Sequence, residues 1–108
     1  MKVRDLAPSL GAEITDIDLS KCFASAGGID PTVMAEIRSV WLDYQVIVIR
    51  KQSITPEQQL RFAKALGEPD IYPFLRGLEG FPMITEVLKK ETEKLNFGGV
   101  WHSDTTYQ

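Results

Sequence analysis

Val46-Ile47-Val48-Ile49 decides the fold class, because four consecutive β-branched residues favour a strand that is buried on both faces. Helices are predicted on either side of this strand. Upstream, Asp30 is a good N-cap and Pro31 suits the first helical position. Downstream, Thr55-Pro56-Glu57-Gln58 has the pattern of a capping box, and Gly67 stands where a second helix would end. The stretch therefore predicts a domain in which helices flank a sheet.

Both predicted helices carry apolar residues at helical spacing, which indicates one buried face on each. In the first helix these residues are Val33, Ile37, Val40, Trp41 and Tyr44. In the second they are Leu60, Ala63 and Leu66, with Phe62 alongside. We expect Trp41 and Tyr44 to belong to the core rather than to a ligand-binding surface.

Short strands are predicted before and after this central region. Residues 1–6 form one strand, which Pro8 ends. In residues 11–19 the apolar side chains stand at even positions up to Ile14 and at odd positions from Ile17 onward. A bulge near Thr15-Asp16 is therefore expected, because it would turn both halves toward one core. Residues 68–82 are rich in Pro and Gly and predict an irregular segment. Residues 83–88 and 100–107 are the remaining strands, and the whole order predicts an α+β fold.

The composition limits the chain to one globular domain or part of one. With 108 residues, of which 44% are hydrophobic and 25% charged, it can form a single core. A net charge of −3 argues against nucleic acid as a partner, because proteins that bind it carry basic patches. No apolar run is long enough for a membrane span, and the N-terminus lacks the apolar core of a secretory signal. The single cysteine, Cys22, excludes an internal disulfide, so a cytoplasmic location is expected.

His102 and Asp104 are the residues best suited to metal chemistry. In an extended strand, residues two apart point to the same face with Cα atoms about 6.6 Å apart, so both side chains can bind one ion. A His-x-Asp pair plus a distant second His forms the facial triad of non-haem Fe(II) oxygenases. His102 is the only histidine, so the chain supplies two ligands of three. Trp101 and Ser103, on the opposite face, would anchor the strand, and Gly98-Gly99 leaves room for close approach.

Other chemistries have less support. A His-x-Asp pair also occurs as an exposed or hydrogen-bonded pair that binds no metal. Ser103 has no second histidine that would act as its base, and Cys22 has no neighbouring residues that would make it a nucleophile, which argues against a hydrolase. Asp16 and Asp18 form a second spaced carboxylate pair, but such residues more often face solvent or form an Asx turn.

Three stretches together resemble the taurine dioxygenase (TauD/TfdA-like) family of Fe(II)- and 2-oxoglutarate-dependent dioxygenases. Residues 10–20 are similar to the opening strand of the family. Residues 46–50, the helix from Thr55 and Leu66-Gly67-Glu68-Pro69 match its next signature. Residues 96–107 resemble its metal motif, Trp-His-Ser/Thr-Asp-x-Thr-Tyr/Phe. The order and spacing of the three stretches are more specific than any one of them.

The resemblance implies a double-stranded β-helix, a jelly roll of the clavaminate synthase-like type with two flanking helices. His102 and Asp104 would be its first two Fe(II) ligands. In this family 2-oxoglutarate and O₂ are consumed to hydroxylate a small-molecule substrate, with release of succinate and CO₂. The second metal His and the Arg that binds 2-oxoglutarate are expected beyond residue 108. Residues 1–108 would thus be the N-terminal portion of a single dioxygenase domain, with an incomplete barrel.

The resemblance also bears on the substrate. In taurine-cleaving relatives a His in an Ile-His-Pro stretch contacts the sulfonate, and here Ile71-Tyr72-Pro73 places Tyr72 at that position. An Asn four residues before the metal His is replaced by Gly98. Both differences argue against taurine itself and leave a small organic acid, sulfonate or sulfate ester. Thr105 would line the substrate side, whereas Tyr72 is equally compatible with an ordinary half-buried aromatic residue.

Two further interpretations stay open. The chain could be a non-catalytic, barrel-like binding module in which His102 and Asp104 form a hydrogen-bonded pair and bind no metal. It could also be a truncated relic without metal. A barrel of about eight strands needs more strands than this chain offers, so an unpaired sheet edge would remain. We therefore expect the isolated chain to be poorly stable and catalytically inactive. A homo-oligomer is compatible with the sequence.

Overall fold

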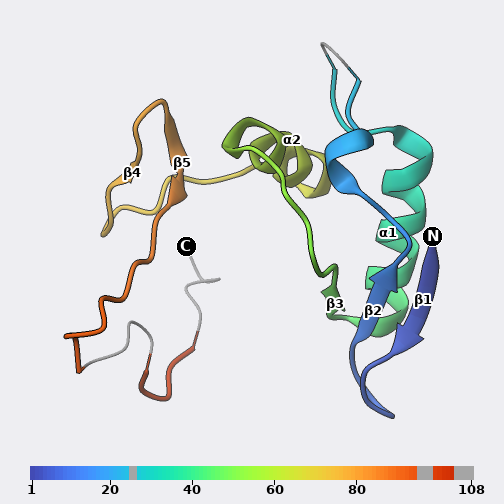
Figure 1. Ribbon diagram of the computed structural model, residues 1–108, viewed down its shortest axis with the longest axis horizontal. Coiled ribbons are helices and arrows are strands. Elements are labelled where there is room, and N and C mark those ends of the chain that lie inside the picture. Colours follow the sequence, from blue (N-terminus) through green and yellow to red (C-terminus); the bar gives the residue numbers. More distant parts are fainter. Residues whose placement is uncertain (25–26, 95–98, 104–108) are drawn as a thin grey trace.

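The computed structural model describes residues 1–24, 27–94 and 99–103. In chain order the elements are β1 (Lys2–Asp5), β2 (Ala12–Thr15), the 3₁₀ helix η1 (Leu19–Lys21), α1 (Pro31–Tyr44), β3 (Ile47–Val48), α2 (Pro56–Leu66), β4 (Gly77–Leu78) and β5 (Phe81–Thr85). Strands β1, β2 and β3 form one sheet, and β4 and β5 form another. Figure 1 shows α1 beside the first sheet and α2 between the two sheets. The predicted combination of two helices with sheet is confirmed.

β2 is the central strand of the first sheet. It pairs antiparallel with β1 and parallel with β3, where Ala12 lies opposite Ile47. A parallel pair requires a crossover connection, which here contains α1. Gly11 precedes β2 with a φ of 90°, and its N–H donates to the carbonyl of Tyr44 at 3.0 Å. This bond joins the start of β2 to the end of α1.

The predicted bulge near Thr15-Asp16 is wrong. β2 ends at Thr15, and Asp16 has a left-handed φ of 58°, which Asp adopts more readily than most residues. Beyond this turn, the half-buried Ile17 and the buried Leu19 pack on the same core as Ile14. The shift of the apolar residues from even to odd positions therefore results from a turn that ends the strand, not from an extra residue within it.

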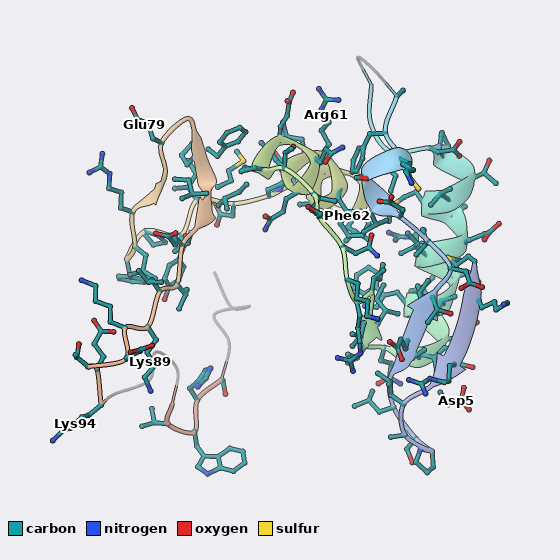
Figure 2. The ribbon with its side chains drawn as sticks, in the orientation of Figure 1. Asp5, Arg61, Phe62, Glu79, Lys89 and Lys94 are labelled. Carbon is teal, nitrogen blue, oxygen red and sulfur yellow. The ribbon has the colours of Figure 1, made fainter. Side chains whose placement is uncertain are left out.

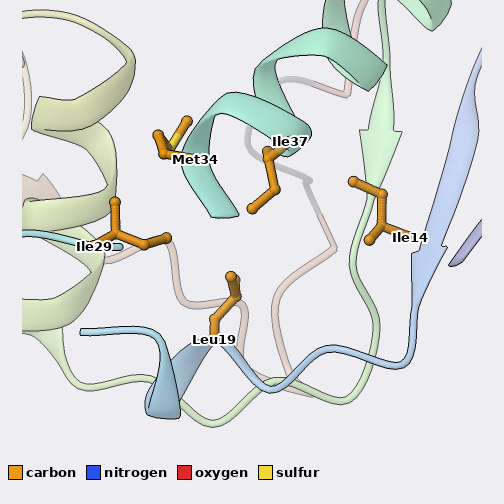
Figure 3. Packing of buried hydrophobic residues seen from close by; sticks show 5 residues of the cluster. All are labelled: Ile14, Leu19, Ile29, Met34 and Ile37. Carbon is orange, nitrogen blue, oxygen red and sulfur yellow. The ribbon is translucent and has the colours of Figure 1, made fainter. Parts of the chain in front are cut away.

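The core lies between β2, η1 and α1 (Figure 3). Its buried hydrophobic side chains are Ile14, Leu19, Ile29, Met34 and Ile37. Ile14 and Ile37 are the most enclosed, with exposed fractions of 1% and 0%. α2 adds only half-buried side chains to this core, namely Phe62 and Leu66. The core is small, so each enclosed side chain carries a large share of the stability.

Both predicted helix starts are confirmed. The Asp30 carboxylate accepts from the N–H groups of Thr32 and Val33 at 2.7 and 3.3 Å. At the start of α2, Thr55 and Gln58 form the expected capping box, with side chain to backbone distances of 3.2 and 3.0 Å. α2 ends at Leu66, immediately before Gly67, as predicted.

Trp41 does not join the core, contrary to the prediction, whereas Tyr44 is half-buried. The buried residues of α1 are Met34 and Ile37, and the two-residue β3 leaves little sheet beside the last turn of the helix. The Trp41 indole N–H instead donates to the carbonyl of Gln45 at 3.0 Å.

The prediction that residues 46–49 are buried on both faces is also wrong. β3 contains only Ile47 and Val48, both half-buried, and Val46 before it is exposed. β3 is the edge of the sheet that the structure describes, and α1 lies on one face of that sheet. Within the described residues, the other face of β3 therefore lacks the second layer that a buried strand requires.

The C-terminal third differs from the prediction in three places. β4 lies within the segment expected to be irregular and pairs antiparallel with β5, which starts at Phe81 rather than Met83. Residues 99–103 form no strand, and residues 104–107 of the predicted last strand lie outside the described residues. A strand needs partners for its N–H and C=O groups, and no described strand pairs with residues 99–103. Among the described residues, no helix is long and apolar enough to cross a membrane.

Candidate metal site

The backbone holds the His102 ring through one of its nitrogens. Its side chain is exposed, and Nδ1 lies 2.8 Å from the carbonyl oxygen of Val100. A carbonyl oxygen only accepts hydrogen bonds, so Nδ1 is the donor in this contact. Metal-binding histidines commonly donate their other ring N–H to a backbone carbonyl in this way. The contact with Val100 therefore orients the His102 ring in the way that is common for metal-binding histidines.

The other predicted residues of the motif are only partly described. Asp104 and Thr105 lie outside the described residues, so the shared-face geometry of His102 and Asp104 stays a prediction. The anchoring role expected of Trp101 and Ser103 is wrong for the described segment, because both side chains are exposed and Trp101 reaches 104%. Since residues 99–103 form no strand, alternate side chains there have no opposite sheet face to pack on.

Tyr72 lies in the segment between α2 and β4 and is half-buried. Its ring packs edge-on against Phe74, with centroids 5.4 Å apart and planes inclined by 71°. This is a favourable aromatic geometry. Phe74 was not predicted as a site residue from the sequence, although two aromatic residues on either side of Pro73 were the available signal. The pair offers an apolar surface with one phenolic hydroxyl.

Asp16 and Asp18 have structural partners. Asp16 pairs with Lys2 at 2.8 Å, and Asp18 pairs with Lys21 at 3.0 Å. The Asp18 carboxylate also accepts from the backbone N–H of Ser20 at 3.1 Å, which makes it the cap of η1. Hydrogen bonds from Lys2 and from Ser20 hold the pKa values of Asp16 and Asp18, respectively, below the usual range. The Asx-turn interpretation of Asp18 is confirmed.

Cys22 has the environment of an unreactive thiol. Its Sγ lies 3.3 Å from the carbonyl oxygen of Asp18, and burial raises the pKa of the thiol. A raised pKa lowers the fraction of thiolate, which is the nucleophilic form. Among the described residues, no three His, Cys, Asp or Glu side chains lie close enough to hold a metal ion.

Comparison with known proteins decides the family. The model of the taurine catabolism dioxygenase TauD, TfdA family matches residues 2–108, which is nearly the whole chain. The chain belongs to this family. The resemblance seen in the three sequence stretches is thus confirmed.

Two curated relatives of this TauD/TfdA family chain are 2-oxo acid-dependent enzymes. An alpha-ketoglutarate-dependent sulfate ester dioxygenase from Pseudomonas putida is 28% identical over 99% of the chain and 33% of its own length. An (S)-phenoxypropionate/alpha-ketoglutarate-dioxygenase from Sphingobium herbicidovorans is 27% identical over 95% of the chain and 36% of its own length. The chain therefore spans about a third of each relative.

Solved structures agree with this family assignment. A taurine dioxygenase from Burkholderia xenovorans superposes with a TM-score of 0.62 and 32% identity, covering 75% of this chain and 27% of that one. The structure of AAD-2 in complex with Mn(II) and N-oxalylglycine gives a TM-score of 0.55 and 27% identity, covering 65% of this chain and 23% of that one. The mixed α and β arrangement is thus shared with TauD dioxygenases.

Proposed function

We propose that this chain contributes the first two Fe(II) ligands, His102 and Asp104, to a 2-oxoglutarate-dependent dioxygenase. The observation that carries the proposal is the His102-x-Asp104 spacing, with the His102 ring held through Nδ1 at 2.8 Å from the Val100 carbonyl oxygen, an arrangement common for metal-binding histidines. The family membership of residues 2–108 supports the same role. The iron, when bound, supplies the centre at which 2-oxoglutarate and O₂ react.

The residues present fit such an ion in part. His102 supplies an imidazole, and Asp104 supplies a carboxylate two residues later. One His and one carboxylate are two members of the 2-His-1-carboxylate set that non-haem Fe(II) prefers. The third protein ligand and the cofactor-binding Arg are assigned to sequence beyond residue 108. Residues 1–108 alone are therefore expected to bind metal weakly and to be catalytically inactive.

The proposal includes the fold of the whole domain. Residues 1–108 would be the N-terminal portion of one double-stranded β-helix domain, placed in the cytoplasm and compatible with a homo-oligomer. The edge position of β3 supports this proposal, because additional strands would cover its exposed side.

The proposed substrate is a small organic acid, sulfonate or sulfate ester, which would be hydroxylated with release of succinate and CO₂. Its support is the chemistry named for the two curated relatives, a sulfate ester and a phenoxypropionate. Tyr72 would contribute a hydroxyl donor and, with Phe74, an apolar wall. Thr105 would line the same side of the site. A tyrosine side chain carries no positive charge, so Tyr72 favours a substrate whose acidic group is bound elsewhere.

A paramagnetic titration tests the metal site. Mn(II), added to the isotope-labelled chain without oxygen, should broaden the NMR signals of His102 and Trp101 in a saturable manner. His102→Ala and Asp104→Ala should each lose this broadening, whereas the control Asp18→Ala should keep it because Asp18 is a helix cap. Equal Mn(II) affinity in the parent chain and in His102→Ala would overturn the proposal. Succinate formation by the 108-residue chain with Fe(II) and 2-oxoglutarate would contradict the expected inactivity.

A further inference from the structure

A groove between α1 and α2 has the features of a ligand site that is not explained by the metal chemistry. Its volume is about 530 Å³, within the range of small-molecule pockets. Ile29 and Met34 form its buried apolar floor, with exposed fractions of 6% and 8%. Pro31 and Ala35 on the α1 side and Ala65 on α2 complete the apolar lining.

Three cationic side chains surround this apolar floor. Arg38 comes from α1, and Arg61 and Lys64 come from α2. Among the described residues that line the groove, none is acidic, although the chain as a whole carries a net charge of −3. Cations from two separate helices therefore gather where the surface is otherwise apolar, which gives the groove a positive rim.

The cations of the rim are not equivalent. Arg61 donates to the carbonyl of Gly27 at 2.8 Å and to Glu57 at 2.6 Å, so its guanidinium is held in place and partly neutralised. Figure 2 shows Arg61 and Phe62 on opposite sides of α2, with Phe62 toward the core. Within the part of the chain that the structure describes, Arg38 and Lys64 make no ion pair, so their charges remain for a ligand.

We propose that the groove between α1 and α2 binds a small amphipathic monoanion, such as an acyl carboxylate. The apolar tail would lie on Ile29, Met34 and Ala35, and the carboxylate would lie between Arg38 and Lys64 at the rim. Burial of the tail supplies the larger favourable term, and the two cations select the charge and orientation of the ligand. The proposal does not depend on the metal site, because none of the described motif residues, 99–103, lines the groove.

Octanoate is the probe for this groove. Titrated into the full 108-residue chain, it should cause saturable NMR shifts of the Met34 and Ala35 methyl groups. Acetate, which lacks the tail, and octylammonium, which has the opposite charge, should leave these signals unchanged. The absence of saturable shifts with octanoate, or equal shifts with octylammonium, would overturn the proposal.

Matched variants test whether octanoate binds at the groove or is attracted by positive charge in general. Arg38→Gln and Lys64→Gln should each weaken octanoate binding about two- to five-fold, the size expected for one exposed charge pair. The control pair Arg76→Gln and Lys90→Gln removes the same charge elsewhere and should leave the affinity unchanged. Ala35→Phe fills the groove without removing a cation and should abolish binding while circular dichroism stays unchanged. Equal weakening by both pairs would show non-specific attraction and overturn the proposal.

Discussion

Arg50 and Glu13, which are 37 residues apart, are joined by a hydrogen bond of 3.1 Å from Nε to Oε1. The other carboxylate oxygen of Glu13 accepts from Arg4. Glu13 is only 6% exposed, whereas the two arginine side chains remain largely in solvent. Because Arg4 is on β1, Glu13 on β2 and Arg50 just after β3, one buried carboxylate fixes the lateral order of all three strands.

Glu13 should make the stability of the chain depend on pH. The hydrogen bond from Arg4 holds the pKa of Glu13 below its ordinary range, with the charges of both arginines acting in the same direction and burial opposing them. A carboxyl group whose pKa is lower in the folded state stabilises the fold above its unfolded pKa. This contribution should disappear as the pH falls through the folded pKa. Urea unfolding of the parent chain between about pH 6 and pH 3 should show the loss.

Variants identify Glu13 as the source of the effect. Glu13→Gln should be less stable than the parent near neutral pH, and its stability should fall less steeply on acidification. Asp16→Asn removes only the exposed ion pair with Lys2 and should leave the neutral-pH stability close to that of the parent. A Glu13→Gln variant with the same pH profile as the parent would contradict the role given to the buried carboxylate.

Gln52 joins the segment after β3 to the segment before η1. Its amide accepts from the Leu19 N–H at 2.8 Å and donates to the carbonyls of Ile17 and Arg50 at 3.0 and 2.9 Å. Gln52→Ala removes the side-chain amide to which these three backbone groups are hydrogen-bonded. The free energy of unfolding should therefore fall by about 1–3 kcal/mol. Gln59→Ala, at an exposed position of α2, serves as the control and should stay within about 0.5 kcal/mol of the parent. Urea unfolding of both variants provides the comparison.

Helix boundaries were predictable because their determinants are local. Asp30 and Thr55 cap the backbone N–H groups that follow them directly, so the residue pattern alone defines both helix starts. The burial of Trp41 and of β3 was not predictable in the same way. It depends on how much sheet lies beside them, and that is set by strand pairings between distant parts of the chain.

The candidate site was predictable only as a set of residues. The spacing of His102 and Asp104 identifies potential ligands, and the family match supports their context. The hydrogen bond between His102 and Val100 depends on local backbone conformation, which the expected strand did not include. The cationic groove could not be predicted either, because Arg38 and Lys64 line the same groove only as a result of how α1 and α2 pack.

Ile37 is the most sensitive position of the core. Its side chain is fully buried between α1 and the sheet, so Ile37→Ala should lower the free energy of unfolding by about 2–5 kcal/mol. Leu42→Ala provides the matched control on the same helix, because Leu42 is 66% exposed and should cost no more than about 0.5 kcal/mol. Amide hydrogen exchange of α1 measures the stability of both variants, because it can be followed even in a variant too unstable for a full unfolding curve. Similar exchange rates in the two variants would contradict the assigned core.

Thr55 should control the start of α2, and through it the groove between the helices. Its hydroxyl accepts from the Gln58 N–H at 3.2 Å while the Gln58 side chain accepts from the Thr55 N–H at 3.0 Å. Thr55→Ala removes one half of this capping box and should cost about 0.5–2 kcal/mol, with faster hydrogen exchange in the first turn of α2. Thr55→Ser keeps the hydroxyl and should restore most of the loss, whereas Ser53→Ala, outside the helix, should have little effect. An unchanged exchange rate in Thr55→Ala would mean that tertiary contacts, such as the packing of Phe62 and Leu66, hold α2 in place without the cap.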